Sequence, residues 1–223
     1  MISFKQKHIV VIDPGLRIPE TDVFNTLSTF SKVPFTYHLP GIADVESLNR
    51  EDPAGIQAII VLGGGASLTE KIEWRHKLES WFKSCLDEKV PTLAVAWGHQ
   101  WIAHLFGGKV GLIPHIEEKV KGFRQFTLKE SGPFKNSQGR LAFSHRAMVL
   151  EAPQASKCFI ESTYIENEGF VYDNYPIYSF QAHPEATEIY LKNGNYPKTY
   201  SSEDLKFGHS LIKDFLNWSE TYK

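Results

Sequence analysis

The sequence predicts a single α/β domain over residues 1–223, built on a doubly wound, mainly parallel β-sheet with flanking helices and a β-rich extension. Up to residue 106, short apolar runs alternate with segments in which apolar residues recur at helical spacing. Such alternation implies right-handed crossovers between parallel strands. From residue 111 to about 178, short β segments separated by turns replace this pattern. No linker-like stretch marks a domain boundary.

The parallel strands are predicted from continuous apolar runs, which are typical of strands buried on both faces of a sheet. These runs are residues 8–12, 35–39, 56–62 and 92–96. The helices between them are predicted from apolar residues spaced three or four apart. The first helix is expected to begin near Thr21 or Asp22, which are good capping residues. The other two are expected over residues 68–86 and 98–106.

The second half of the chain predicts a β-rich insert or an extension of the sheet. Its β segments are residues 118–128, 139–145, 157–165, 169–173 and 176–183. Residues 192–202 are polar and rich in turn formers, so we expect an exposed loop there. The chain closes with an amphipathic helix over residues 203–218, with Leu211 and Phe215 turned inward.

Composition excludes several functional classes. A net charge of −2 offers no basic field for a phosphate backbone, so nucleic acid is not expected as a partner. No apolar run reaches the roughly 18 residues of a membrane span, and we expect no signal peptide. Cys85 and Cys158 form no disulfide framework, which favours a cytoplasmic location. His99 and His104 lack the spacing of paired zinc ligands, so we expect no metal and no cofactor.

The stretch around Ala96 has the pattern of a sharp strand-to-helix turn. Small residues stand two positions before and two positions after it, at Ala94 and Gly98. They let a strand and a helix approach closely around a strained backbone, as in the nucleophile elbows of hydrolases. The backbone N–H of Trp97 would then face outward at a helix N-terminus, where it can donate to an oxyanion. An ordinary strand–turn–helix of a doubly wound sheet has the same spacing.

Two further segments follow predicted strands, at the edge where open α/β sheets bind ligands. Residues 63–65 are three glycines, which allow close approach of a substrate to the backbone. A plain glycine turn is an equally good interpretation, and a phosphate loop is excluded because no Gly-Lys-Ser/Thr follows. His183 and Glu185 flank a proline, so the histidine can act as a base that the carboxylate orients. Alone, His183 is also compatible with a core or surface histidine.

Together the three segments resemble motifs of the class I glutamine amidotransferase family, whose fold is flavodoxin-like. The family's glycine loop, GGP-x-S, is matched by GGGAS at residues 63–67. Its elbow, G-[IV]-C-x-G-x-Q, is matched by AVAWGHQ at residues 94–100, and its H-P-E by residues 183–185. The resemblance extends over nearly the whole chain, whose length is similar to that of stand-alone members and of the glutaminase domain of GMP synthase.

The resemblance implies hydrolysis of the side-chain amide of glutamine, or of a γ-glutamyl compound, through a Cys-His-Glu triad. It makes His183 the base, Glu185 its orienting partner and Ala96 the nucleophile position. The backbone N–H groups of Gly64 and Trp97 would form the oxyanion hole. The implied substrate-binding residues are Gly65, Gln100, Ser144, His145 and Arg146. The implied partners are a glutamine or γ-glutamyl small molecule and a separate synthetase or acceptor subunit.

The chain departs from the family pattern at functional positions. Ala96 replaces the cysteine, and loss of a triad nucleophile costs about 10⁶-fold in rate, as measured on subtilisin. We therefore expect an inactive amidase, either an engineered Cys→Ala variant or a natural pseudoenzyme with a binding or regulatory role. The family's S-H-G-D-x-V segment is altered at Arg146 and Ala147, and Gly65 stands where proline is usual. A third alternative is chemistry in which His183 acts with water or a metal.

Overall fold

A computed structural model describes residues 6–66, 68, 70–113, 115, 118–129, 132–162 and 164–222. Ser67, the last residue of the GGGAS loop, lies outside the described residues. At the centre is a seven-stranded sheet with the order β2-β1-β3-β4-β12-β11-β9. Five of these strands run parallel to one another: β1 (His8–Ile12), β2 (Phe35–His38), β3 (Ile56–Val61), β4 (Thr92–Val95) and β12 (Tyr175–Phe180).

The sheet continues beyond β12 with two antiparallel strands, β11 (Phe170–Tyr172) and β9 (Ser156–Cys158). The predicted fold class, a mainly parallel sheet with a β-rich extension, is thus confirmed. The sequence pattern groups β12 with the β-rich part, but this strand pairs in parallel with β4 and belongs to the main sheet.

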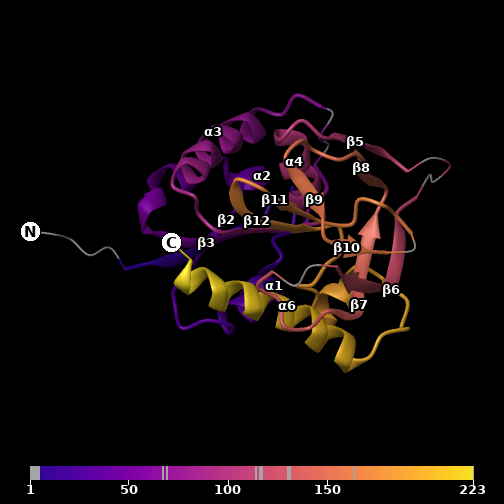
Figure 1. Ribbon diagram of the computed structural model, residues 1–223. Coiled ribbons are helices and arrows are strands. Elements are labelled where there is room, and N and C mark those ends of the chain that lie inside the picture. The colour runs from indigo at the N-terminus through magenta and orange to yellow at the C-terminus, as the bar shows by residue number, and fades with distance from the viewer. Residues whose placement is uncertain are drawn as a thin grey trace, which may run out of the picture.

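Helices cover both faces of the sheet (Figure 1). The helices α3 (Glu73–Asp87) and α4 (Trp97–Leu105) pack on one face, where alternate strand residues such as Val61 and Ala94 meet Phe82 and Trp101. On the other face lie α1 (Thr21–Ser28) and α6 (Ser202–Thr221). The intervening strand residues, among them Ile60 and Val95, contact Leu211 and Phe215 there. Two apolar layers therefore stabilise the sheet, which explains why its strands have continuous apolar sequences.

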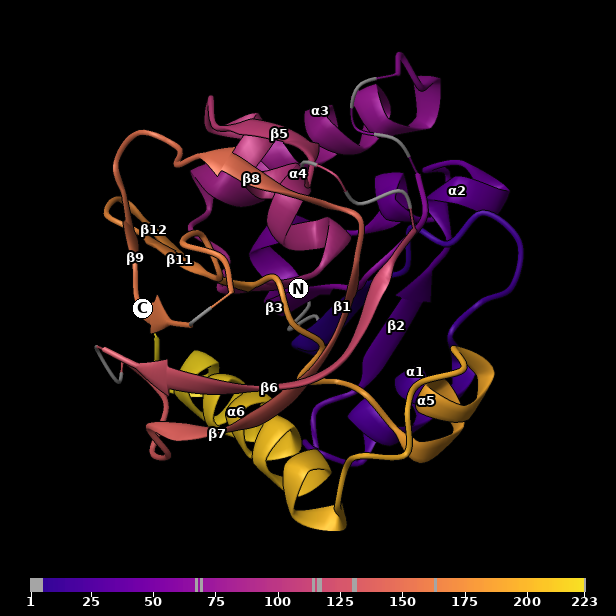
Figure 2. The same ribbon diagram turned by 90° about the vertical axis from the view of Figure 1, so that its right-hand side faces the viewer.

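The remaining strands form two small antiparallel sheets beside the main one (Figure 2). The hairpin of β6 (Val120–Leu128) and β7 (Gln138–His145) carries the short strand β10 (Ile160–Glu161) on its edge. The strands β5 (Lys109–Leu112) and β8 (Ala147–Glu151) form the second pair and lie near α4. The sequence did not predict β5 or β8 as strands.

Short helices complete the fold. They are α2 (Pro40–Ala43), α5 (Glu188–Asn193) and two 3₁₀ turns at Leu48–Arg50 and Pro53–Gly55. None of these was predicted, because pieces this short show no helical periodicity. The helix expected over residues 68–86 begins only at Glu73, and the closing helix begins at Ser202 with a capping box of Ser201 and Asp204. No helix among the described residues is long and apolar enough to cross a membrane.

Candidate active site

The turn after β4 is a strained elbow. Ala96 adopts φ 48° and ψ −105°, a region that residues with a Cβ rarely occupy, at a cost of about 1–3 kcal/mol. Its backbone N–H donates to the carbonyl of Phe180 on β12 at 2.8 Å, which fixes the elbow to the neighbouring strand. A Cβ at Gly98 would lie 2.7 Å from the carbonyl oxygen of Val61, so only glycine lets α4 start this close to β3.

The end of β12 positions a buried histidine–glutamate pair. The Nδ1 atom of His183 lies 2.8 Å from Oε1 of Glu185, and the two side chains are only 4% and 2% exposed. A carboxylate accepts this hydrogen bond, so the proton of the neutral imidazole is on Nδ1 and Nε2 is left as a proton acceptor. The backbone N–H of His183 donates to the carbonyl of Ala142 on β7 at 2.8 Å. The hydroxyl of Tyr190 packs against the ring, 3.2 Å from Nδ1.

Gly63 brings the elbow and this pair together. A Cβ built on Gly63 would lie 2.9 Å from Cε1 of His183 and 3.4 Å from the Cβ of Ala96. The imidazole and the alanine methyl group therefore both lie next to the position that a Cβ of residue 63 would occupy. Any side chain at residue 63 would separate them.

Acidic residues from the loop after β1 line the cavity close to this pair. Asp13 is fully buried, and its carboxylate accepts hydrogen bonds from the backbone N–H groups of Gly15 and Glu20, both at 2.8 Å. Burial and the nearby carboxylates of Asp13 and Glu185 raise the pKa of Glu20 above its usual range. The cavity wall near His183 is thus rich in carboxylates.

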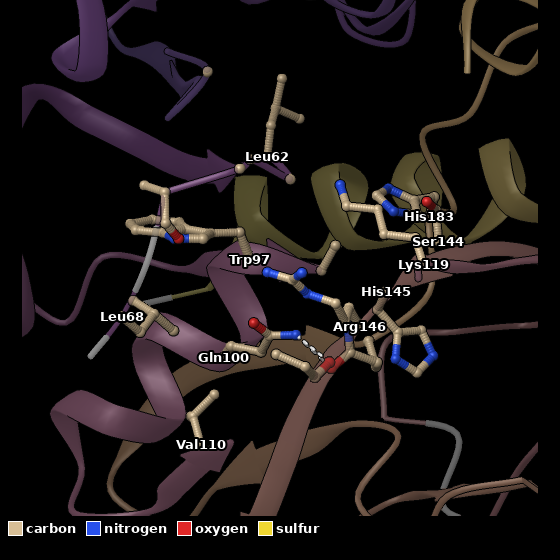
Figure 3. A pocket seen from close by; sticks show the side chains of 18 of the residues that line it. Leu62, Leu68, Trp97, Gln100, Val110, Lys119, Ser144, His145, Arg146 and His183 are labelled. Atoms are coloured by element: carbon tan, nitrogen blue, oxygen red, sulfur yellow. Dashed lines mark hydrogen bonds between the residues drawn. The ribbon is translucent and has the colours of Figure 1, made fainter. Parts of the chain in front are cut away.

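The first turn of α4 forms the opposite wall. The indole of Trp97 is 3% exposed and donates from Nε1 to the carbonyl of Ala66 at 2.9 Å. Because Trp97 is the first residue of α4, its backbone N–H has no acceptor within the helix. The Nε2 atom of Gln100 donates to the carbonyl of Ala147 at 2.8 Å and to Oε1 of Gln181 at 3.0 Å. Gln100 therefore fixes the position of β8 and presents only its Oε1 to the cavity, as Figure 3 shows.

These walls enclose a cavity of about 560 Å³, within the usual size range of small-molecule sites. Gly64, Gly65, Ser144, His145 and Arg146 also line it. In Figure 3 the guanidinium of Arg146 extends into the cavity towards Trp97, whereas Lys119 lies on the side of His183 and Ser144. The cavity thus has two cationic groups in addition to these carboxylates.

His145 is held away from bulk water by a buried ion pair. Its Nε2 lies 3.2 Å from Nη1 of Arg124, whose Nη2 is 2.7 Å from Oε2 of the fully buried Glu168. Arginine can only donate, so Nε2 of His145 is an acceptor and the ring is neutral. Burial, followed by the charge of Arg124, lowers the pKa of His145 to about 4. This side chain is 5% exposed and acts as a rigid part of the wall.

Every residue proposed for the site from the sequence lines this one cavity. They are Ala96, His183, Glu185, Gly64, Trp97, Gly65, Gln100, Ser144, His145 and Arg146. Sequence reasoning identified the glycine loop but gave Gly63 no role of its own, and it missed Asp13, Glu20, Lys119 and Tyr190. The signal for Asp13 was available, since the Asp-Pro-Gly at residues 13–15 directly follows the first strand. Among the described residues, no group of three or more His, Cys, Asp or Glu side chains is arranged to hold a metal ion.

Comparison with known proteins places this site in a family context. Residues 26–192 match the family model described as glutamine amidotransferase class-I. The glutamine-hydrolyzing GMP synthase subunit of Pyrococcus abyssi is 32% identical over 150 residues, which are 66% of this chain and 74% of the relative. The corresponding protein of Methanosphaera stadtmanae is 27% identical and covers 66% and 73%. A glutamine amidotransferase structure from Thermotoga maritima superposes with a TM-score of 0.77 at 17% identity, over 96% and 99% of the two chains.

Proposed function

The chain belongs to the class I glutamine amidotransferase family, and from this premise we propose that its cavity binds a glutamine-like or γ-glutamyl small molecule without cleaving it. The observation that carries the proposal is the elbow at Ala96, which faces the His183–Glu185 pair but has no nucleophilic atom. A γ-glutamyl amide whose carbonyl carbon lies at the elbow would have a base within reach and no nucleophile to attack it.

A cysteine at residue 96 would complete the site. Its thiol proton would pass to Nε2 of His183 as the sulfur attacks the amide carbon. The backbone N–H groups of Trp97 and Gly64 would stabilise the resulting oxyanion. The carbon–nitrogen bond would then break, the leaving nitrogen would take the proton from His183, and a thioester would remain. Water, deprotonated by the same histidine, would release the γ-carboxylate and the thiol.

With alanine at residue 96, no side chain can attack the amide carbon and no thioester can form. A water molecule would not be held in position to replace the missing nucleophile. Neither cysteine of the chain can take over this role, because Cys85 is buried in α3 and Cys158 lies on β9. The chain is therefore either an engineered Cys→Ala variant or a natural non-catalytic member of the family. The codon for residue 96 in the natural gene distinguishes these two accounts.

The relatives from Pyrococcus abyssi and Methanosphaera stadtmanae are named as subunits, which suggests a second polypeptide that would accept ammonia. We propose that any such acceptor docks at the mouth of this cavity. A synthetase from the same organism, mixed with this chain at micromolar concentration, should form a complex in analytical ultracentrifugation. Two species that sediment separately, with and without glutamine, would contradict this part of the proposal.

Isothermal titration calorimetry with glutamine and γ-glutamylmethylamide tests the central proposal. At least one of the two should bind with one-to-one stoichiometry and release no ammonia over hours. A His183→Ala variant should still bind, since the histidine is assigned to chemistry rather than to recognition. Absence of binding for every γ-glutamyl compound would contradict the proposed function.

A further inference from the structure

We propose that Lys119 and Arg146 select a γ-glutamyl compound with two carboxylates, one on the γ-glutamyl group and one on the amine attached to it. This inference rests on the proposed function of the cavity and identifies the class of substrate. Glutamine has only the first of these carboxylates. The preferred ligand would thus be a γ-glutamyl amino acid rather than glutamine.

The two cations are not neutralised by the protein. Neither Lys119 nor Arg146 has an ion-pair partner within the part of the chain that the structure describes. By contrast, Arg124, which is next to the same cavity wall, is paired with the buried Glu168. Both side chains are exposed to solvent, and two unpaired cations that line one concave site favour an anionic ligand.

The carboxylates that line the cavity do not supply this partner. Asp13 is occupied by backbone N–H groups of its own loop, and Glu185 by His183. Burial and the neighbouring carboxylates of Asp13 and Glu185 raise the pKa of Glu20, because they disfavour its charged form. Glu70, the fourth carboxylate that lines the cavity, also has an interaction partner of its own. Lys119 and Arg146 are therefore open to carboxylates of a ligand.

The positions of the two cations assign them to different ends of the ligand. Arg146 stands in the turn between β7 and β8, and its guanidinium points towards Trp97 at the elbow (Figure 3). Lys119 precedes β6 and lies on the side of His183 and Ser144. One cation is thus beside the nucleophile position and the other beside the base.

In amide cleavage, the base returns its proton to the leaving nitrogen, so the leaving amine departs on the side of His183. A carboxylate on that amine would meet Lys119, and the α-carboxylate of the γ-glutamyl group would meet Arg146. With glutamine the leaving group is ammonia, which would leave Lys119 without a partner. Lys119 is consequently the group that distinguishes a γ-glutamyl amino acid from glutamine.

The test is a set of binding measurements on the Ala96 protein with γ-glutamylglycine and γ-glutamylmethylamide, which differ by one carboxylate. Calorimetry should give an affinity about tenfold higher for γ-glutamylglycine, as expected for one added charge-assisted hydrogen bond. Lys119→Gln should remove this difference and leave the affinity for γ-glutamylmethylamide unchanged. Arg146→Gln should weaken binding of both compounds by about tenfold.

Two exposed cations remote from the cavity provide matched controls. Lys198→Gln and Arg50→Gln should leave both affinities unchanged, and circular dichroism should verify that all four variants are folded. Equal affinities for the two compounds in the unsubstituted protein, or equal losses with Lys119→Gln, would overturn this inference alone. Failure of both compounds to bind would contradict the proposed function and the inference with it.

Discussion

The imidazole of His183 and the methyl group of Ala96 face each other across Gly63, which has no side chain to separate them. The elbow belongs to β4 and α4, whereas the histidine follows β12, so two distant parts of the chain meet at this point. Both residues line the same cavity.

Ala96→Cys should create hydrolysis of γ-glutamyl amides. The proposed base and oxyanion donors line the same cavity as Ala96, so the gain should be on the order of 10⁶-fold, the size of the loss when the triad nucleophile is removed from subtilisin. The measurement is release of glutamate and of ammonia or amine across a panel of γ-glutamyl compounds. Adding His183→Ala to the cysteine variant should remove the gain. Turnover by the Ala96 protein itself would refute the role assigned to this residue.

Ala96→Gly should stabilise the fold. Glycine accepts φ 48° and ψ −105° without the clash that a Cβ causes, although it costs entropy in the unfolded chain. We expect a net increase of about 1 kcal/mol in the free energy of unfolding. Urea denaturation measures it, with Ala94→Gly as the control on the preceding strand, where glycine should only destabilise. A loss of stability in Ala96→Gly would mean that the elbow is not strained.

Gly63→Ala should disturb the position of the His183 ring. The added methyl group would lie 2.9 Å from Cε1, closer than carbon atoms pack, so the imidazole must move. The ring signals of His183 in NMR spectra should shift, and the activity of an Ala96→Cys variant should fall at least about tenfold, because small misplacements of reacting groups are costly. At Gly65 a Cβ meets nothing within 4 Å, so Gly65→Ala should leave the His183 signals in place. Identical spectra for both variants would contradict the contact.

Acid should destabilise the protein partly through His99. This side chain is fully buried, stacks on Phe170 and is hydrogen bonded to Ser179. Burial lowers its pKa from 6.5 to about 3. Between these values the unfolded chain binds a proton that the folded protein does not, so stability falls as the pH drops below about 6.5. The contribution approaches about 1.4 kcal/mol per pH unit.

Urea denaturation at pH 7, 6 and 5 measures this effect. His99→Gln should reduce the pH dependence, whereas His104→Gln, an exposed position on the same helix, should not. Part of the dependence should persist in His99→Gln, because the pKa of the buried His145 is also lowered, to about 4. An unchanged slope in His99→Gln would show that this histidine is already protonated in the folded protein.

The sequence predicted the parallel strands well because each is buried on both faces and thus continuously apolar. It could not predict that β12 pairs with β4, since that pairing joins segments far apart in the chain and depends on the whole fold. The short strands β5 and β8 could not be predicted, because exposed apolar residues such as Leu112 and Leu150 interrupt the alternation of apolar and polar residues.

For the site, motif residues were predictable because their spacing follows local backbone requirements. Which of the three successive glycines has no room for a Cβ was not predictable. Only the fold shows that Gly63 packs against His183 and Gly64 against Pro14, whereas Gly65 has open space beside it. Lys119 was likewise indistinguishable from a solvated surface lysine. Its place in the cavity results from the path of the chain into β6, which the sequence does not reveal.

The hydrogen bond from Ala96 to Phe180 has a consequence for how this protein can be modified. It aligns the elbow and His183 through the neighbouring strands β4 and β12, independently of the long segment of chain between them. That segment includes the β6–β7 hairpin and the turn with Arg146, both of which contribute residues to the cavity wall. Loops grafted from other proteins into this segment should therefore change ligand preference while the alignment persists, which makes the chain a modular scaffold for engineering.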